Sequence, residues 1–211
     1  MQFYTNPTII ASFENYIQYL LTHVNPYTGL SYAEDPTVIG YETGNELDGL
    51  KWGDKDVPVE WIREICRFVK KLGTFSTFPF FPTILLMKPE GPNKLCIDGT
   101  YGVNSTHFAV DEVDIFNNHF YPLNNSILTS DITAVQSANR TYLAGEIAWT
   151  GVKGDSLQSF YDIILQRQNT SSPVVVGSTF RSLFGHNVPD CSVSLSPPNT
   201  RIWEFRFLGA G

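Results

Sequence analysis

The sequence predicts an α/β protein built around a parallel β-sheet. Helical periodicity and short apolar strand patterns alternate along most of its 211 residues, which is typical of βαβ units. Two of the strand patterns, within residues 37–47 and 141–151, run directly into carboxylates, Glu46 and Glu146. Parallel sheets present their functional groups at the carboxyl ends of their strands, so both glutamates are predicted to belong to a site.

The composition is that of a globular domain and argues against some classes of function. With 42% hydrophobic and 17% charged residues, the chain can form one domain with a substantial core. The net charge of −7 argues against a nucleic-acid partner, because phosphate binding requires basic patches. No stretch of the sequence reaches the ~18 consecutive apolar residues of a membrane span, so no membrane partner is expected.

Three cysteines, Cys66, Cys96 and Cys191, leave the disulfide state open. Their number is odd, and their spacing matches neither a metal site nor a redox pair. Cys66 lies in a helix pattern and Cys96 in a strand pattern, so both are expected in the core, and one disulfide is possible. The sequence predicts neither a metal site nor a cofactor.

Four Asn-x-Ser/Thr sequons give a modest indication of secretion, although such triplets also arise by chance. They begin at Asn104, Asn124, Asn139 and Asn169. No signal-peptide pattern opens the chain, since Met1 is followed at once by polar residues and a helix pattern.

The first half of the chain predicts two helices around one strand. Asn6 followed by proline is a helix start, and apolar residues at helical spacing extend the first helix over about 7–24. A strand is predicted at 37–42. The second helix runs from Pro58 to Gly73, with acidic residues early and lysines late, as the helix dipole favours.

Residues 73–91 follow neither a helical nor a strand period and are rich in phenylalanine. Loops of this length are unusual in compact domains. Two interpretations remain open: an apolar loop that packs against the domain, or translated sequence that does not belong, such as a retained intron.

The second half predicts further strands and helices in alternation. Strand patterns occur at 95–98, at 113–122, before Glu146 and at 174–180. Thr129 or Ser130 is predicted to cap a helix that ends near Asn139, and Asp155 to cap a later one. The tail from Val188 is rich in proline and serine and ends in a strand-like stretch, 201–207.

Four motifs stand at predicted strand ends: YETGNEL, DGTYG, VDIFNNHFYP and YLAGEIAWTG. In this order they resemble the strand ends of glycoside hydrolase family 5. The stretch FYTNPTIIASFENYI and the context of ETGNEL are most similar to the fungal endo-β-1,4-mannanase branch of that family. The resemblance covers about residues 3–72 and 94–191. It implies a partial (β/α)8 TIM barrel: strands four to eight with their helices, the N-terminal strands missing. The catalytic domain would be 3–191 with an atypical insert at 73–91, and 192–211 an irregular tail.

The resemblance also assigns the site. Glu46 corresponds to the general acid/base and Glu146 to the nucleophile of a retaining glycosidase, whose two carboxyls lie about 5–5.5 Å apart. The implied substrate-binding residues are Asn45, His119, Tyr121 and Trp149. The implied activity is endo-hydrolysis of β-1,4-mannan outside the cell, by a protein whose partner is this polysaccharide.

Some features depart from the family pattern and keep alternatives open. Arg181 stands where a sugar-stacking tryptophan is expected, and Ala148 where this branch often has an acidic residue. The strand-two arginine near the nucleophile has no counterpart, and the chain starts on a helix rather than a strand. The alternatives are a truncated, inactive fragment, a glycan-binding remnant, or a family 5 enzyme acting on β-glucan.

Overall fold

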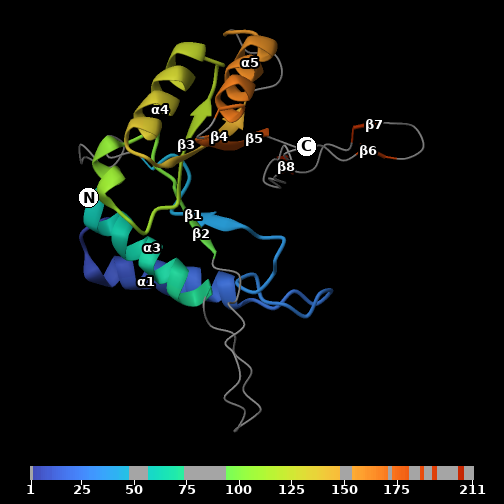
Figure 1. Ribbon diagram of the computed structural model, residues 1–211. Coiled ribbons are helices and arrows are strands. Elements are labelled where there is room, and N and C mark those ends of the chain that lie inside the picture. Colours follow the sequence, from blue (N-terminus) through green and yellow to red (C-terminus); the bar gives the residue numbers. More distant parts are fainter. Residues whose placement is uncertain are drawn as a thin grey trace, which may run out of the picture. The chain divides into compact units, whose positions relative to one another are not determined.

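The computed structural model divides into two compact units, Met1–Ile115 and Phe116–Gly211 (Figure 1). It describes residues 2–47, 57–73, 94–147, 154–170 and 173–180, and the backbone of three short strands beyond them. Most of the stretch 73–91, together with Ala148, Trp149 and Arg181, lies outside the described residues. Among those described, no helix has both the length and the apolar character needed to cross a bilayer.

Two helices form one side of the first unit, α1 (Pro7–Thr22) and α3 (Val59–Gly73), and they lie side by side in Figure 1. The start of α1 is as predicted, because the Asn6 side chain accepts a hydrogen bond from the Thr8 N–H at 2.9 Å. The helix ends at Thr22 rather than near 24, since His23 has extended backbone.

An aromatic cluster around Trp61 joins α1 and α3 in the first unit. The indole of Trp61 on α3 is 2% exposed, and its ring centroid lies 5.0 Å from that of Tyr4 and 5.8 Å from that of Phe13. Edge-to-face and offset-stacked pairs of this kind stabilise a core beyond the area they bury. The aromatic residues of this cluster thus serve packing.

The strands of the first unit, β1 (Gly40–Glu42) and β2 (Leu95–Asp98), pair in parallel. The boundaries predicted for β2 are confirmed. The start predicted for β1, residue 37, is wrong, because the Asp35 carboxylate accepts from the Thr37 N–H at 2.9 Å and from its hydroxyl at 2.7 Å. This local turn keeps Thr37 out of the sheet.

A disulfide joins Cys66 of α3 to Cys96 of β2, across a sequence separation of 30 residues. Both cysteines are fully buried, as their predicted core positions imply. The bond settles which pair forms, a question that the sequence left open, and it fixes the helix to the sheet it covers.

In the second unit, strands that follow one another in the chain are again neighbours in the sheet. They are β3 (Ile115–Phe120), which begins at the boundary, β4 (Thr141–Ile147) and β5 (Val175–Phe180). β4 and β5 are parallel, and β8 (Glu204–Arg206) pairs antiparallel with β5. A separate pair is formed by β6 (His186–Asn187) and β7 (Ser192–Val193).

The helix α4 (Asn125–Ser137) begins earlier than predicted. Asn124 caps it, accepting from the Ile127 N–H at 2.9 Å. Thr129, predicted as a cap, lies inside the helix and donates its hydroxyl to the Asn125 carbonyl at 2.8 Å. A hydroxyl bonded back one turn is compatible with a helix interior, so the Thr129 or Ser130 start is wrong.

The helix α5 (Leu157–Gln168) is capped by Ser156, whose hydroxyl oxygen accepts from the Ser159 N–H at 3.1 Å. The predicted cap, Asp155, instead accepts from the backbone N–H of Asn125 at 2.6 Å. It therefore satisfies an N–H in the first turn of α4, where the helix dipole favours a carboxylate.

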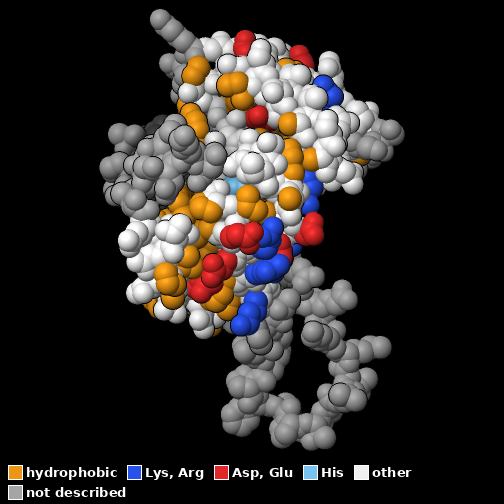
Figure 2. Space-filling model, turned by 90° about the vertical axis from the view of Figure 1, so that its left-hand side faces the viewer, with side chains coloured by type: hydrophobic (Ala, Val, Ile, Leu, Met, Phe, Trp, Pro, Cys, Tyr) orange, Lys and Arg blue, Asp and Glu red, His pale blue; other side chains and the backbone are white. Residues whose placement is uncertain are grey.

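Charged side chains of α3 are of both signs, and Arg63, Arg67 and Lys70 pair with carboxylates. Figure 2 shows a face on which acidic and basic side chains lie beside one another among hydrophobic ones. Arg63 pairs with Glu60, and Arg67 with Glu112. Lys70 pairs with Asp114 at 2.8 Å, so acidic residues of the 111–114 stretch neutralise cations of the helix.

Candidate active site

The centre of the candidate site is Glu146, near the carboxyl end of β4. The residue is 1% exposed, although it carries a carboxylate. The Tyr121 hydroxyl donates a hydrogen bond to its Oε2 at 2.9 Å. Because burying a carboxylate costs free energy unless it is hydrogen-bonded, this contact supports its position.

A β-bulge at Gly145 changes the direction of β4 just before Glu146. The pairing register with β5 shifts between Ala144 and Glu146, and the Thr179 hydroxyl donates to the Gly145 carbonyl at 2.9 Å. A Cβ at Gly145 would lie 2.8 Å from Cδ2 of His119, so the close approach of β3 requires glycine. Bulges of this kind reorient side chains next to active sites.

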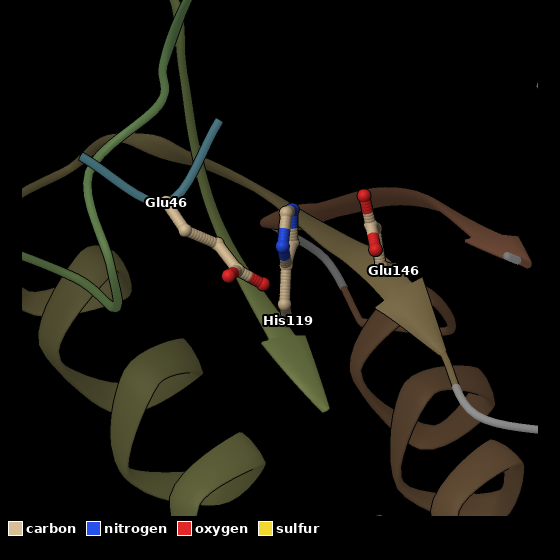
Figure 3. Close-up of side chains that lie close together, drawn as sticks. All are labelled: Glu46, His119 and Glu146. Atoms are coloured by element: carbon tan, nitrogen blue, oxygen red, sulfur yellow. The ribbon is translucent and has the colours of Figure 1, made fainter. Parts of the chain in front are cut away.

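His119 lies on β3, the strand beside β4, and Tyr121 directly follows that strand. Figure 3 shows the His119 ring and the Glu146 carboxylate on these two strands. A ring nitrogen of His119 lies within 4.8 Å of a carboxylate oxygen of Glu146. Imidazole and carboxylate are also metal ligands, but the same groups suit acid–base and nucleophilic chemistry.

A half-buried carboxylate on α4, Asp131, supports the end of β3. Asp131 of α4 accepts from the Asn118 amide at 2.8 Å and from the Tyr142 hydroxyl at 3.2 Å. The Asn118 side chain in turn accepts from the His119 backbone N–H at 2.8 Å. Burial raises the pKa of Asp131, and these two hydrogen bonds oppose the rise.

The other predicted carboxylate, Glu46, lies in the first unit, on the segment that follows β1 (Figure 3). It is half-buried, and the neighbouring Asn45 is exposed. Its backbone has φ +51°, a left-handed conformation that is uncommon for residues other than glycine. Such strained residues cluster at functional sites.

Hydrogen bonds on either side of Glu46 hold this conformation. The backbone N–H of Thr43 donates to a carbonyl of β2 at 3.0 Å, and that of Leu47 donates to the Gly99 carbonyl at 2.9 Å. A Cβ at Gly99 would lie 2.0 Å from the Gly44 carbonyl oxygen, so the two segments approach as closely as glycine allows.

The structure brings three predicted site residues together in the second unit, His119, Tyr121 and Glu146. Glu46 and Asn45 lie adjacent at the end of the strand region of the first unit, and Trp149 lies outside the described residues. The sequence analysis missed the supporting residues, Gly145 among them. An isolated glycine inside a strand pattern is a signal for a bulge and could have identified it.

A buried histidine–aspartate pair, His107 and Asp98, lies at the carboxyl end of β2. Nδ1 of His107 is 2.8 Å from the Asp98 carboxylate, and its Nε2 is 2.9 Å from the Val57 carbonyl oxygen. Asp98 is 1% exposed and His107 fully buried. His107 is therefore structural and ties the start of the α3 segment to β2.

Comparison with known sequences supports the predicted resemblance. The sequence profile described as "GH family 5 beta-mannosidase-like" matches residues 1–80. Mannan endo-1,4-beta-mannosidase 2 of Arabidopsis thaliana is 28% identical over 129 residues, covering 56% of this chain and 30% of that protein. Mannan endo-1,4-beta-mannosidase 8 of Oryza sativa subsp. japonica is 24% identical over 197 residues, covering 89% of this chain and 46% of that protein. The chain thus spans less than half of the length of either relative.

Solved structures show the same fold. A glycoside hydrolase family 5 mannosidase from Rhizomucor miehei, solved as a mutant, matches with a TM-score of 0.61 at 16% identity, over 97% of this chain and 56% of that one. The hyperthermostable endo-1,4-beta-D-mannanase from Thermotoga petrophila matches with a TM-score of 0.59 at 18% identity, over 85% of this chain and 55% of that one. The predicted resemblance and fold class are thereby confirmed: the chain is similar in sequence to the glycoside hydrolase family 5 mannanases and has the fold of part of their (β/α)8 barrel.

Proposed function

We propose that this chain carries the catalytic carboxylates of a retaining endo-β-1,4-mannanase, with Glu146 as nucleophile and Glu46 as general acid/base. Its relatives in plants are named mannan endo-1,4-beta-mannosidases, which supports mannan as the substrate. A related Rhizomucor miehei mannosidase has been solved in complex with mannosyl-fructose, which supports a mannose-binding site.

The mechanism has two displacements at the anomeric carbon. First, Glu146 attacks this carbon and the glycosidic C–O bond breaks, while Glu46 gives its proton to the departing oxygen. Water then attacks the same carbon, Glu46 takes its proton, and the bond to Glu146 breaks. Each step inverts the anomeric carbon, so the product retains the configuration of the substrate.

The neighbouring residues have separate roles in this proposal. The Tyr121 hydroxyl holds Glu146 for attack, and His119 lines the cleft beside it. The amide of Asn45 hydrogen-bonds the sugar 2-hydroxyl, a contact that strengthens as charge develops in the transition state. Trp149 provides an aromatic surface for a sugar ring.

The observation that carries the proposal is the hydrogen bond from Tyr121 to the buried Glu146 carboxylate. At 2.9 Å it is directed to one oxygen of a side chain that is 1% exposed. A carboxylate held at the carboxyl end of a parallel strand suits nucleophilic attack better than a solvated surface acid does.

The test is release of reducing ends from galactomannan by the chain and by its Glu146→Gln and Glu46→Gln variants. We expect both variants to lose turnover, and Glu42→Gln, a nearby exposed acid on β1, to retain it. ¹H NMR of the first product should show the β anomer. Turnover by Glu146→Gln equal to that of the parent would overturn the assignment.

A glycan-binding role without cleavage is the second candidate. It is favoured by one observation, namely that Arg181 stands where the resemblance leads one to expect a sugar-stacking tryptophan. Calorimetric binding of mannohexaose without reducing-end release would support it. Release from β-glucan but not from mannan would instead assign a different family 5 substrate.

We also propose that the protein acts outside the cell. The Cys66–Cys96 disulfide supports this, because such bonds persist in oxidising compartments. The four sequons agree with passage through a secretory pathway.

A further inference from the structure

The four sequons of this chain differ sharply in their structural surroundings. N-glycosylation attaches a bulky, hydrated sugar to the side-chain nitrogen of asparagine, so the folded protein must leave that atom facing solvent. Attachment precedes folding in the secretory pathway, but a glycan on an atom that the fold buries prevents completion of the fold. Surface geometry therefore selects the sites that survive in the secreted protein.

Asn139 and Asn169 meet this requirement. Both side chains are exposed. Asn139 follows α4 with φ +54°, a left-handed conformation that asparagine tolerates well, and one residue, Arg140, separates it from β4. Asn169 is the C-cap of α5, with its backbone N–H bonded to the Leu165 carbonyl at 3.1 Å, so the main chain is fixed while the side chain faces outward.

Asn104 does not meet the requirement. Its side-chain oxygen accepts from the Thr106 N–H at 3.0 Å and from the Thr106 hydroxyl at 2.7 Å. These bonds turn its side-chain nitrogen toward Nε2 of the fully buried His107, at 3.4 Å. The sugar would thus be attached to the atom that faces the core, and the sequon hydroxyl is itself engaged.

Asn124 is also unsuited. It is half-buried and caps α4 through its side-chain oxygen. The residues on both sides of it are closely packed. The Asn125 side chain donates to the Ser159 hydroxyl at 2.9 Å. Gly154 lies so close to Leu123 that a Cβ on Gly154 would be 2.5 Å from the Leu123 carbonyl oxygen.

We propose that Asn139 and Asn169 are N-glycosylation sites of this protein and that Asn104 and Asn124 are not. The proposal rests on the extracellular localisation proposed above. The two sites belong to one edge of the second unit, because α4 and α5 end there side by side: Arg167 donates to the Gln136 side chain at 3.4 Å. At this edge β4 begins.

The glycans would lie away from the candidate nucleophile. Asn139 precedes the first residue of β4, and Glu146 lies near its other end. At ~3.3 Å per residue, the strand separates the two by roughly 20 Å. A glycan at this edge is therefore compatible with a polysaccharide bound at the opposite edge.

The test is expression of the chain behind a cleavable secretion signal in a eukaryotic host. Secreted protein and cell lysate are both treated with peptide N-glycosidase F in ¹⁸O-water, and peptides are mapped by mass spectrometry. We expect isotope-labelled aspartate at Asn139 and Asn169 and unmodified asparagine at Asn104 and Asn124. The Asn139→Gln and Asn169→Gln variants should each lose one glycan from the intact mass, and the matched Asn124→Gln variant none.

Unmodified asparagine at Asn139 and Asn169 in both fractions, or equal modification of all four sequons in secreted protein, would overturn the proposal. The Asn139→Gln, Asn169→Gln double variant should keep any mannan-degrading activity of the parent. Because the peptide map does not depend on turnover, failure of the glycan proposal and failure of the proposed enzymatic function are distinguishable.

Discussion

The hydroxyl of Tyr121 makes the contact to Glu146 on which the proposed chemistry depends most directly. Hydrogen bonds to charged groups contribute about 1.5–3 kcal/mol. Removing this one with Tyr121→Phe should therefore lower kcat on galactomannan by roughly 10–100-fold, at 1.36 kcal/mol per factor of ten. Initial rates at saturating substrate measure the change.

Tyr27→Phe is the matched control, because the Tyr27 side chain is 96% exposed and should be neutral to the same change. A Tyr121→Phe variant with unchanged kcat would show that the hydroxyl does not orient the nucleophile. A loss in the control as well would indicate damage unrelated to the site.

His107 makes a second prediction at this scale. His107→Ala leaves the Asp98 carboxylate buried without its imidazole partner, and breaking such a buried pair costs about 3–5 kcal/mol. Urea unfolding followed by tryptophan fluorescence should show this loss, while the exposed His23→Ala should stay near the parent. Equal midpoints for the two variants would contradict a buried pair.

At the scale of elements, the disulfide between α3 and β2 should be a major source of stability. Closing a loop of 30 residues is expected to stabilise the folded chain by about 3–4 kcal/mol, mainly by restricting the unfolded state. The Cys66→Ala, Cys96→Ala double variant should lose this amount in urea unfolding. The Cys191→Ala variant is the control. A reductant should lower the free energy of unfolding of the parent toward that of the double variant, and it should leave the double variant unchanged.

The half-buried Asp131 should make the stability of the fold depend on pH. Its folded pKa is raised by burial, so the fold favours the protonated carboxyl. This contribution is present below the unfolded pKa, about 3.9, and is lost as pH rises through the folded pKa. As pH rises from the unfolded pKa through the folded pKa, the parent should therefore lose stability relative to the Asp131→Asn variant, which cannot ionise at this position. Unfolding midpoints at a series of pH values measure it, and a constant difference would contradict the raised pKa.

The order of the elements and the place of Glu146 near the end of its strand could be predicted from the sequence, but several boundaries could not. Apolar periodicity defines a helix face or a strand, and the carboxylates follow the strand patterns directly. The start of α4 depends on which of several capping residues the fold uses. Asp155 accepts from the first turn of α4 instead of capping α5, because tertiary packing brings it to Asn125. The bulge that turns Glu146 likewise depends on pairing with β5.

For the whole molecule, we predict self-association when the chain is expressed alone. Among the described strands, β1 has β2 as its single neighbour, which leaves its other side as a sheet edge. Unpaired edges template association with further copies. Light scattering coupled to size exclusion should show mass that rises with concentration, and a monodisperse monomer throughout would contradict this expectation.

The bond between Cys66 and Cys96 also makes the intervening chain topologically separate from the rest. A single peptide-bond cut anywhere between the two cysteines would leave both products covalently joined, so the nicked protein would migrate as one band until it is reduced. Because the closure cost grows only with the logarithm of loop length, about 0.6 kcal/mol per doubling, residues added or removed between the cysteines should be tolerated. The stretch 73–91 lies inside this ring, and its length can therefore vary in evolution while α3 and β2 keep their places.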